Sequence, residues 1–184
     1  GLATSDNKKF VRFWWDVLPS QISEKWFPYT KGAGAERWFA PIRSVIDWQD
    51  NGKRVKESIE KAYPYLRGKT SWVVKNQSYY FKRGLTFSLV SSGTLSVRVM
   101  PEGSIFDVGG SALFPSLSDE LSLLAYLNSS FAAVCAEWLN PTLNFQVGDI
   151  KKMPFPSFTN DEKKMLEELA QEAVSLKRDL FGFD

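Results

Sequence analysis

The sequence predicts a mixed α+β (α/β) protein with a largely antiparallel twisted sheet, flanking helices and a long C-terminal amphipathic helix. Three observations lead to this class. Apolar residues alternate with polar ones in the middle of the chain, they recur every three or four residues on both sides of it, and glycines separate the alternating runs. With 184 residues, 43% apolar and 15% aromatic, the chain has enough apolar side chains to build a core.

The first half begins with a predicted helix over residues 5–18, SDNKKFVRFWWDVL, in which capping residues precede aromatic and aliphatic residues at helical spacing. Two short strands, KWFPY and RSVIDW, then flank a glycine turn, and QDNG ends the second strand. KRVKESIEKAYPYL follows as a helix, because its apolar residues recur at spacings of four, three and four from Val55 to Leu66. Pro64 weakens its last turn.

The middle of the chain contains four strand-like runs, SYYF, LTFSLV, LSVRVM and SALF, separated by glycines. Alternation places Leu85, Phe87 and Leu89 on one face of the second run. The corresponding residues of the third run are Leu95, Val97 and Val99. A glycine-containing hairpin would make the two sets cross-strand neighbours.

Helical patterns return in the last third, at DELSLLAYL and at SSFAAVCAEWL, which stops before Pro141. The final helix, NDEKKMLEELAQEAVSLKRDLF, carries an apolar stripe formed by Met165, Leu169, Ala173, Leu176 and Leu180. We expect this stripe to be buried against the domain's own core or against another chain or domain. The preferred division is a recognition domain over residues 1–156, followed by this helix in residues 157–184.

Composition excludes several classes of chemistry. The chain has no histidine and one cysteine, so the usual zinc sites and His-dependent triads are ruled out. Cys135 lies in an apolar neighbourhood typical of a buried thiol. No EF-hand, phosphate-binding glycine loop, long apolar stretch or signal peptide is recognisable. We therefore expect no metal, no membrane and a cytoplasmic location.

The net charge of +2 conceals an asymmetry along the chain. Residues 25–98 carry fourteen Lys or Arg against five Asp or Glu, whereas residues 99–184 carry six against thirteen. The basic half also holds four of the seven tryptophans. Cations interleaved with aromatic side chains favour contact with a nucleic acid, although ordinary surface solubility and core packing are the alternatives.

Several motifs, in order, resemble a known family. GLATSDNKKF resembles the opening motif G-x-x-T-G-x-N-x-x-F of the target recognition domains of fused adenine-specific DNA methyltransferases, with Ser5 in place of glycine. KWFPYTKGAGAERWF, YYFKRGLTFSLVSSGTLSVRV, SIFDVGG and LNPTLNFQVGDIKKMPFP resemble later segments of BREX PglX-type enzymes and of related TaqI-like specificity domains. The resemblance covers residues 1 to about 156 and leaves open whether the parent belongs to BREX phage defence or to restriction-modification.

The resemblance also shows what this chain lacks. Such enzymes share a glycine motif for AdoMet and an Asn/Asp-Pro-Pro-Tyr motif for the target amino group, and neither occurs here. Asn140-Pro141-Thr142 is the nearest approach and is better interpreted as a helix stop leading into a strand. The resemblance thus implies a non-catalytic specificity fragment of a prokaryotic enzyme. Its expected partners are double-stranded DNA and the methyltransferase core of the same polypeptide, and AdoMet is the cofactor of the parent enzyme.

The candidate DNA-binding residues are cations and short polar side chains beside glycines and strand ends, because phosphates and base edges are bound by such groups. They are Lys31, Arg37, Lys75, Asn76, Gln77, Lys82 and Arg83, followed by Ser91, Ser92 and Arg98. Each has a structural alternative: Arg98 pairs with a carboxylate, and residues 75–77 form an ordinary polar turn. Catalytic, cofactor-binding and metal-binding residues are not expected.

Two other functions stay open. The first is a protein-interaction module that docks a methyltransferase or another defence subunit through the acidic half and the terminal helix. The second is a small complete enzyme such as a nuclease, which the lack of histidine and of an acidic metal cluster disfavours.

Overall fold

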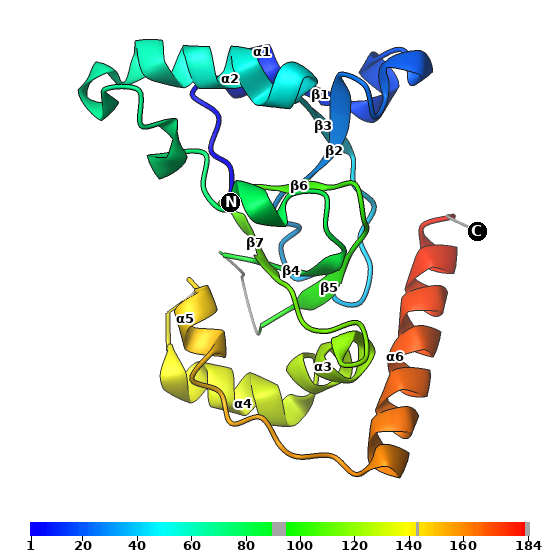
Figure 1. The fold of residues 1–184 in the computed structure, drawn as a ribbon. Helices are drawn as coiled ribbons and strands as arrows, with labels where there is room; N and C mark the ends of the chain where they lie inside the picture. Colours follow the sequence, from blue (N-terminus) through cyan, green and yellow to red (C-terminus); the bar gives the residue numbers. More distant parts are fainter. Residues whose placement is uncertain (90–94, 143, 183–184) are drawn as a thin grey trace. The chain divides into compact units, whose positions relative to one another are not determined.

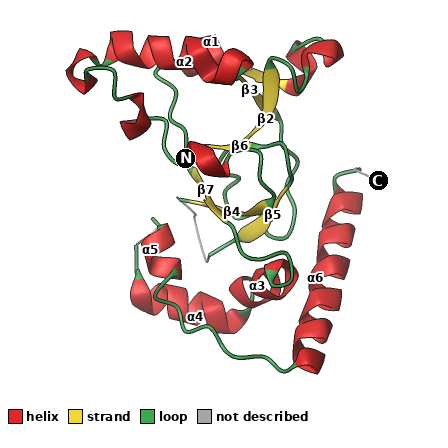
Figure 2. Ribbon diagram, viewed as in Figure 1, coloured by secondary structure: helices red, strands yellow, loops and turns green. Residues whose placement is uncertain are grey.

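The computed structural model describes residues 1–89, 95–142 and 144–182 (Figures 1 and 2). The chain divides into two compact units, the first formed by Gly1–Lys31, Ile42–Arg83 and Pro101–Val108 and the second by Gly32–Pro41, Gly84–Met100 and Gly109–Asp184. The first contains fifteen Lys or Arg against nine Asp or Glu, and the second eight against twelve. We call them the basic unit and the acidic unit.

The predicted fold class is confirmed. Among the described residues the chain has six α-helices, a long one at its C-terminal end, and two mainly antiparallel sheets. The difference from the expectation is that the strands form one sheet in each unit. Both units therefore have their own sheet and their own buried apolar residues.

The sheet of the basic unit has the strand order β1-β3-β2-β6, and Figure 1 labels these strands. Its strands are β1 (Val11–Phe13), β2 (Trp26–Thr30), β3 (Ser44–Asp47) and β6 (Ile105–Phe106). Strands β1 and β2 each pair antiparallel with β3, while β2 and β6 are parallel. The predicted strands KWFPY and RSVIDW correspond to β2 and β3 and are confirmed.

The helix predicted over residues 5–18 is wrong. Only Asn7–Phe10 is helical, as α1, and the Asp6 side chain caps it by accepting a 3.1 Å hydrogen bond from the Lys9 N–H. The chain then pairs with β3 as β1, and Trp14 N–H donates to Arg43 O at 3.0 Å. Aromatic and β-branched residues are favourable in strands, and β3 supplies hydrogen bonds to this strand. The spacing of apolar residues in the sequence gives no information on such a partner.

The second helix, α2 (Gln49–Ala62), buries Val55 and Ile59 of the predicted stripe, whereas Ala62 is exposed and Leu66 lies in the 3₁₀ turn after the helix. Its regular part is preceded by left-handed backbone at residues 50–52. Gly52 is required there, because φ is +68° and a Cβ would lie 2.6 Å from the Trp48 ring.

Short 3₁₀ turns connect the other elements of the basic unit. They span Trp14–Asp16, Pro19–Gln21, Pro64–Leu66, Thr70–Trp72 and Gln77–Tyr79. The last of them shows that the predicted strand SYYF is wrong. The Tyr80 ring is buried, 5.4 Å from the rings of both Trp48 and Phe106, and the chain must turn to insert it.

The sheet of the acidic unit is antiparallel and has the order β5-β4-β7. Its strands are β4 (Gly84–Ser88), β5 (Val97–Met100) and β7 (Gly110–Leu113). Leu85 faces Val99 and Phe87 faces Val97, which confirms the predicted cross-strand neighbours. Leu89 lies beyond the end of β4, and the predicted hairpin glycine, Gly93, lies outside the described residues.

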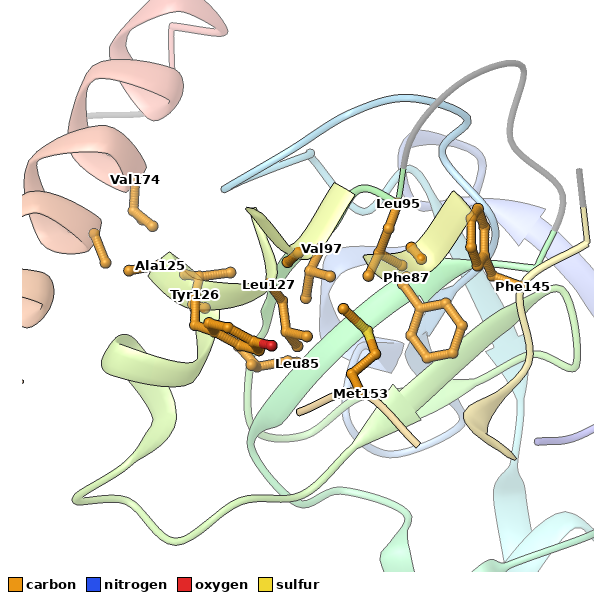
Figure 3. Close-up of a cluster of buried hydrophobic side chains, with 14 residues drawn as sticks. Leu85, Phe87, Leu95, Val97, Ala125, Tyr126, Leu127, Phe145, Met153 and Val174 are labelled. Carbon is orange, nitrogen blue, oxygen red and sulfur yellow. The ribbon is translucent and has the colours of Figure 1, made fainter. Parts of the chain in front are cut away.

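Four helices complete the acidic unit. They are α3 (Glu120–Leu127), α4 (Ser130–Leu139), α5 (Val147–Ile150) and α6 (Asn160–Leu180). Helix α3 contacts β4 and β5, and α6 contacts α3. Figure 3 shows the resulting core, in which Leu85, Phe87 and Val97 lie near Leu127 and Met153.

The helix predicted at SSFAAVCAEWL ends at Leu139, before Pro141, as expected. Among the described residues after Leu139 there is no strand, and the Asn140 amide donates 2.8 Å hydrogen bonds to Asn144 O and to Asp149 Oδ2. The chain instead enters α5, whose first turn has a capping box between Gln146 and Asp149.

The apolar stripe predicted on the long helix α6 is not buried within this chain, so its burial against another chain or domain stays a prediction. Its buried residues are Ala170 and Val174, whereas the stripe residues Met165, Leu169, Leu176 and Leu180 are 63%, 55%, 58% and 80% exposed. Ala173 is half-buried. Small side chains allow α6 to approach α3 closely. Two ion pairs fix its rotation, Lys163 to Asp119 at 2.6 Å and Lys177 to Glu36 at 2.9 Å.

No helix in the described part of the chain is long and apolar enough to cross a membrane.

The rotation of α6 can be tested by placing a carboxylate on either face. Val174→Asp should lower the free energy of unfolding of the 184-residue chain by about 3–5 kcal/mol, because the charge would be buried without a partner. Leu169→Asp is the matched control and should change it little, since that side chain is exposed. Urea unfolding followed by circular dichroism measures both. Equal losses would show that the stripe is buried after all.

Candidate nucleic-acid interface

A long stretch of the chain contains cations and no carboxylate. Between Glu60 and Glu102 there is no Asp or Glu, while the Lys and Arg residues are Lys61, Arg67, Lys69, Lys75, Lys82, Arg83 and Arg98. All but Arg98 belong to the basic unit. These six cations are exposed, so the basic unit presents several positive charges to solvent over residues 61–83.

Exposed aromatic rings accompany these cations. Tyr65, Trp72 and Tyr79 are 75%, 65% and 43% exposed, although rings of this size are usually mostly buried. The segment 61–83 thus combines the two kinds of side chain that bind the sugar-phosphate backbone and the faces of bases.

The loop that carries most of the predicted residues is fastened by Tyr80. The buried Tyr80 hydroxyl donates a 2.9 Å hydrogen bond to Lys75 O, and burial raises the pKa of Tyr80, so the donor keeps its proton at neutral pH. Tyr79 N–H donates to Asn76 O at 3.0 Å. The side chains of Lys75 and Asn76 remain exposed on a well-defined backbone.

The C-terminal end of this loop presents Lys82 and Arg83 to solvent. The Lys82 ammonium lies over the Tyr79 ring, 5.0 Å from its centroid. Phe81 anchors this end, since its N–H donates to Ser104 O at 2.8 Å and its ring lies 5.2 Å from that of Phe27. The exposed cations therefore sit on an anchored turn.

The structure places six predicted residues in the basic unit, namely Lys31, Lys75, Asn76, Gln77, Lys82 and Arg83. Lys31 and Gln77 are half-buried, and the other four are exposed. The Lys31 ammonium lies 5.6 Å from the centroid of Tyr29, whose hydroxyl donates to Leu2 O at 2.9 Å inside the unit. These assignments to DNA binding stay predictions.

Arg37 and Arg98 lie in the acidic unit and have internal contacts. The Arg37 guanidinium donates to Asn128 O at 3.5 Å. Arg98 is only 3% exposed and donates to Ser88 Oγ at 3.4 Å. Burial lowers the pKa of Arg98 to about 10, partly offset by the charge of Glu36, so it remains protonated at neutral pH. This geometry favours the structural alternative for Arg98.

Ser91 and Ser92, the remaining predicted residues, lie outside the described residues.

The glycine turn KGAGAER is attached to the sheet of the acidic unit from Gly32 onward. Ala33 N–H donates to Ser88 Oγ at 3.0 Å. Trp38 forms two backbone hydrogen bonds with β5: Trp38 N–H donates to Val97 O at 2.8 Å, and Val99 N–H donates to Trp38 O at 3.0 Å. Gly32 fits against Gly109, where a Cβ would lie 2.9 Å from the carbonyl oxygen. The backbone of Trp38 thus holds the end of the turn to β5.

Sequence reasoning missed four exposed residues of the basic unit: Tyr65, Arg67, Lys69 and Trp72. With Leu66 they line a cavity of about 250 Å³. The signal was present, because two aromatic residues flank two basic residues within the stretch that lacks carboxylates. Within the described residues, no group of three or more potential metal ligands occurs.

Exposed cations combined with exposed aromatic rings are typical of surfaces that bind nucleic acids. No protein-family model matches the chain. It is 34% identical over 178 residues to the adenine-specific methyltransferase BrxX of Escherichia coli O9:H4 (strain HS), with 92% of this chain covered. It is 30% identical over 193 residues to the adenine-specific methyltransferase PglX of Lacticaseibacillus casei (strain Zhang), with 97% covered.

These two relatives confirm the predicted resemblance: the chain is homologous to a segment of BREX adenine-specific methyltransferases of the BrxX and PglX type. The chain spans only 13% and 15% of the lengths of these relatives.

The role of Ser88 in holding the glycine turn can be tested by removing its hydroxyl. Ser88→Ala should lower the free energy of unfolding by about 1–3 kcal/mol, because the half-buried Ala33 N–H and the buried Arg98 guanidinium lose an acceptor. Chemical unfolding measures this loss, with the exposed Ser175→Ala as control. A midpoint equal to that of the control would mean that Ser88 does not hold the turn.

Proposed function

We propose that this chain recognises double-stranded DNA on behalf of an adenine-specific DNA methyltransferase of a prokaryotic defence system. The observation that carries the proposal is the surface of residues 61–83, where six exposed cations and four exposed aromatic rings, Phe81 among them, occur without a carboxylate. Homology to adenine-specific methyltransferases supports DNA as the polyanion.

The contacts of the basic unit suit a duplex. Lys82 and Arg83 are adjacent exposed cations on an anchored turn, an arrangement that grips phosphates without reading sequence. Lys75 and Asn76 are exposed on the neighbouring part of the same loop, and an amide can bond to an adenine edge in the major groove. The loop therefore offers both backbone contacts and base contacts.

Recognition without catalysis is the role that fits this segment. The chain contains neither a glycine motif for AdoMet nor an Asn/Asp-Pro-Pro-Tyr motif, and it spans less than a sixth of its relatives. We assign AdoMet binding and methyl transfer to the methyltransferase core of the same polypeptide. The cytoplasm of a prokaryotic cell, where the DNA is, is the location that this function requires.

A second candidate function is favoured by α6. Met165, Leu169, Leu176 and Leu180 leave an apolar stripe exposed over most of the helix, and such stripes commonly form interfaces. The remainder of the polypeptide is the partner we assign to it, because the relatives carry more than five-sixths of their length outside this segment. This interface is compatible with DNA binding by the basic unit.

The DNA proposal predicts that the adjacent cations Lys82 and Arg83 contribute to the salt dependence of binding. In the full-length enzyme, Lys82→Ala with Arg83→Ala should weaken binding to duplexes of any sequence. It should also reduce the slope of log K against log salt by about 0.9 for each lost phosphate contact. Fluorescence anisotropy over a salt series measures both quantities.

The matched control is Lys151→Ala with Lys152→Ala, an equally exposed pair of adjacent lysines in the acidic unit. This control should leave affinity and slope unchanged. If both pairs behave alike, the basic loop does not face DNA, and the protein-interaction function takes precedence.

A further inference from the structure

The segment between α2 and the Tyr80 loop forms a small cavity of its own. Tyr65, Leu66, Arg67, Lys69 and Trp72 line about 250 Å³, just below the roughly 300–1,000 Å³ of drug-sized ligand sites. All five lie within eight consecutive residues of the basic unit. None of these five residues belongs to the predicted set of DNA-binding residues.

The cavity has an ordered backbone. Leu66 is buried and provides the apolar floor. Lys69 N–H donates to Leu66 O at 2.9 Å, and Trp72 N–H donates to Lys69 O at 3.2 Å. Val74 N–H donates to Thr70 O at 2.8 Å, and Val74 itself is buried. The exposed rings of Tyr65 and Trp72 are therefore held on a hydrogen-bonded loop.

The side chains around the cavity offer donors and ring faces. Arg67 and Lys69 are exposed, and neither forms an ion pair with any residue that the structure describes. The Tyr65 hydroxyl and the Trp72 indole N–H are likewise donors without a partner in the described part of the chain. A ligand that satisfies this set must carry negative charge and a flat apolar face.

We infer that this cavity binds a single unpaired nucleotide of a DNA strand, with the base against Trp72 and Tyr65 and the phosphate on Arg67 and Lys69. The inference rests on the proposed DNA function and adds a contact of a different kind. A base stacked within a duplex has both faces covered, so aromatic side chains can reach a base face only where a nucleotide has left the stack. The site would thus hold distorted or locally opened DNA.

Other ligands fit the cavity less well. A protein carboxylate would satisfy the cations and leave two ring faces bare. An apolar peptide would cover the rings and leave Arg67 and Lys69 unneutralised. A nucleotide can neutralise the two cations and cover the two rings at once, because a single sugar links its phosphate to its base.

The test compares single-stranded and duplex oligonucleotides with variants of the full-length enzyme. Tyr65→Ala with Trp72→Ala should weaken binding of single-stranded DNA about tenfold, because each stacked base depends on its aromatic partner. Duplex affinity should fall by less than threefold. Trp72→Phe retains a ring and should keep single-strand affinity within about threefold of the wild type.

Trp14→Ala is the matched control, because Trp14 is a comparably exposed tryptophan of the same unit and does not line the cavity. It should leave single-strand affinity unchanged. Arg67→Asn with Lys69→Gln should reduce the single-strand salt slope by about 0.7 for each lost phosphate contact. Asparagine suits the left-handed backbone of position 67, so this variant preserves the loop.

A local measurement accompanies the affinities. A single-stranded oligonucleotide with 5-iodouracil, irradiated on the wild-type enzyme, should crosslink to Tyr65 or Trp72, as identified by peptide mass spectrometry. Unchanged single-strand affinity in the Tyr65→Ala, Trp72→Ala variant overturns the inference, wherever the crosslink maps. If duplex binding still depends on Lys82 and Arg83 in that case, the proposed function survives. If the wild type binds no DNA of either kind, both fail.

Discussion

The absence of carboxylates from residues 61–101 is the constraint on which the functional surface depends. Burying an ammonium or guanidinium group is costly unless a carboxylate pairs with it, and six of the seven cations in this stretch are exposed. The exception, Arg98, is buried beside the Ser88 hydroxyl and within reach of the Glu36 charge from another part of the acidic unit. A local shortage of negative charge therefore leads directly to a basic surface on one unit.

Aromatic contacts inside the basic unit fix the backbone that carries this surface. Tyr80 packs between Trp48 and Phe106 and fastens the backbone of Lys75, while Phe81 pairs with Phe27 and with the backbone of Ser104. The same loop leaves Tyr79 exposed beneath Lys82. Aromatic residues thus have two roles here: Tyr80 and Phe81 anchor the loop to the basic unit, and Tyr79 presents an exposed ring beside Lys82.

The sequence predicted the structure best where local periodicity alone determines it. Alternation predicted the β4 and β5 faces, and the register pairs Leu85 with Val99 and Phe87 with Val97. Periodicity failed where contacts distant in sequence determine the local structure. β1 is a strand because β3 supplies its hydrogen bonds, and SYYF forms a turn because the Tyr80 ring is inserted into the core. In α6 the periodicity was correct, but small residues at Ala170 and Val174 pack on α3 instead of the larger stripe. For the site, the distribution of charge along the sequence identified the basic half. The cavity beside Trp72 could not be predicted, because only the fold shows which aromatic rings are exposed.

The central claim is that the basic unit meets DNA through residues 61–83. Hydrogen-deuterium exchange of the full-length enzyme, measured with and without genomic DNA of mixed sequence at low salt, tests it most directly. The account predicts slower exchange in peptides covering residues 61–83 when DNA is present, and unchanged exchange along α6. DNA-dependent protection confined to other segments, with residues 61–83 unaffected, would contradict it.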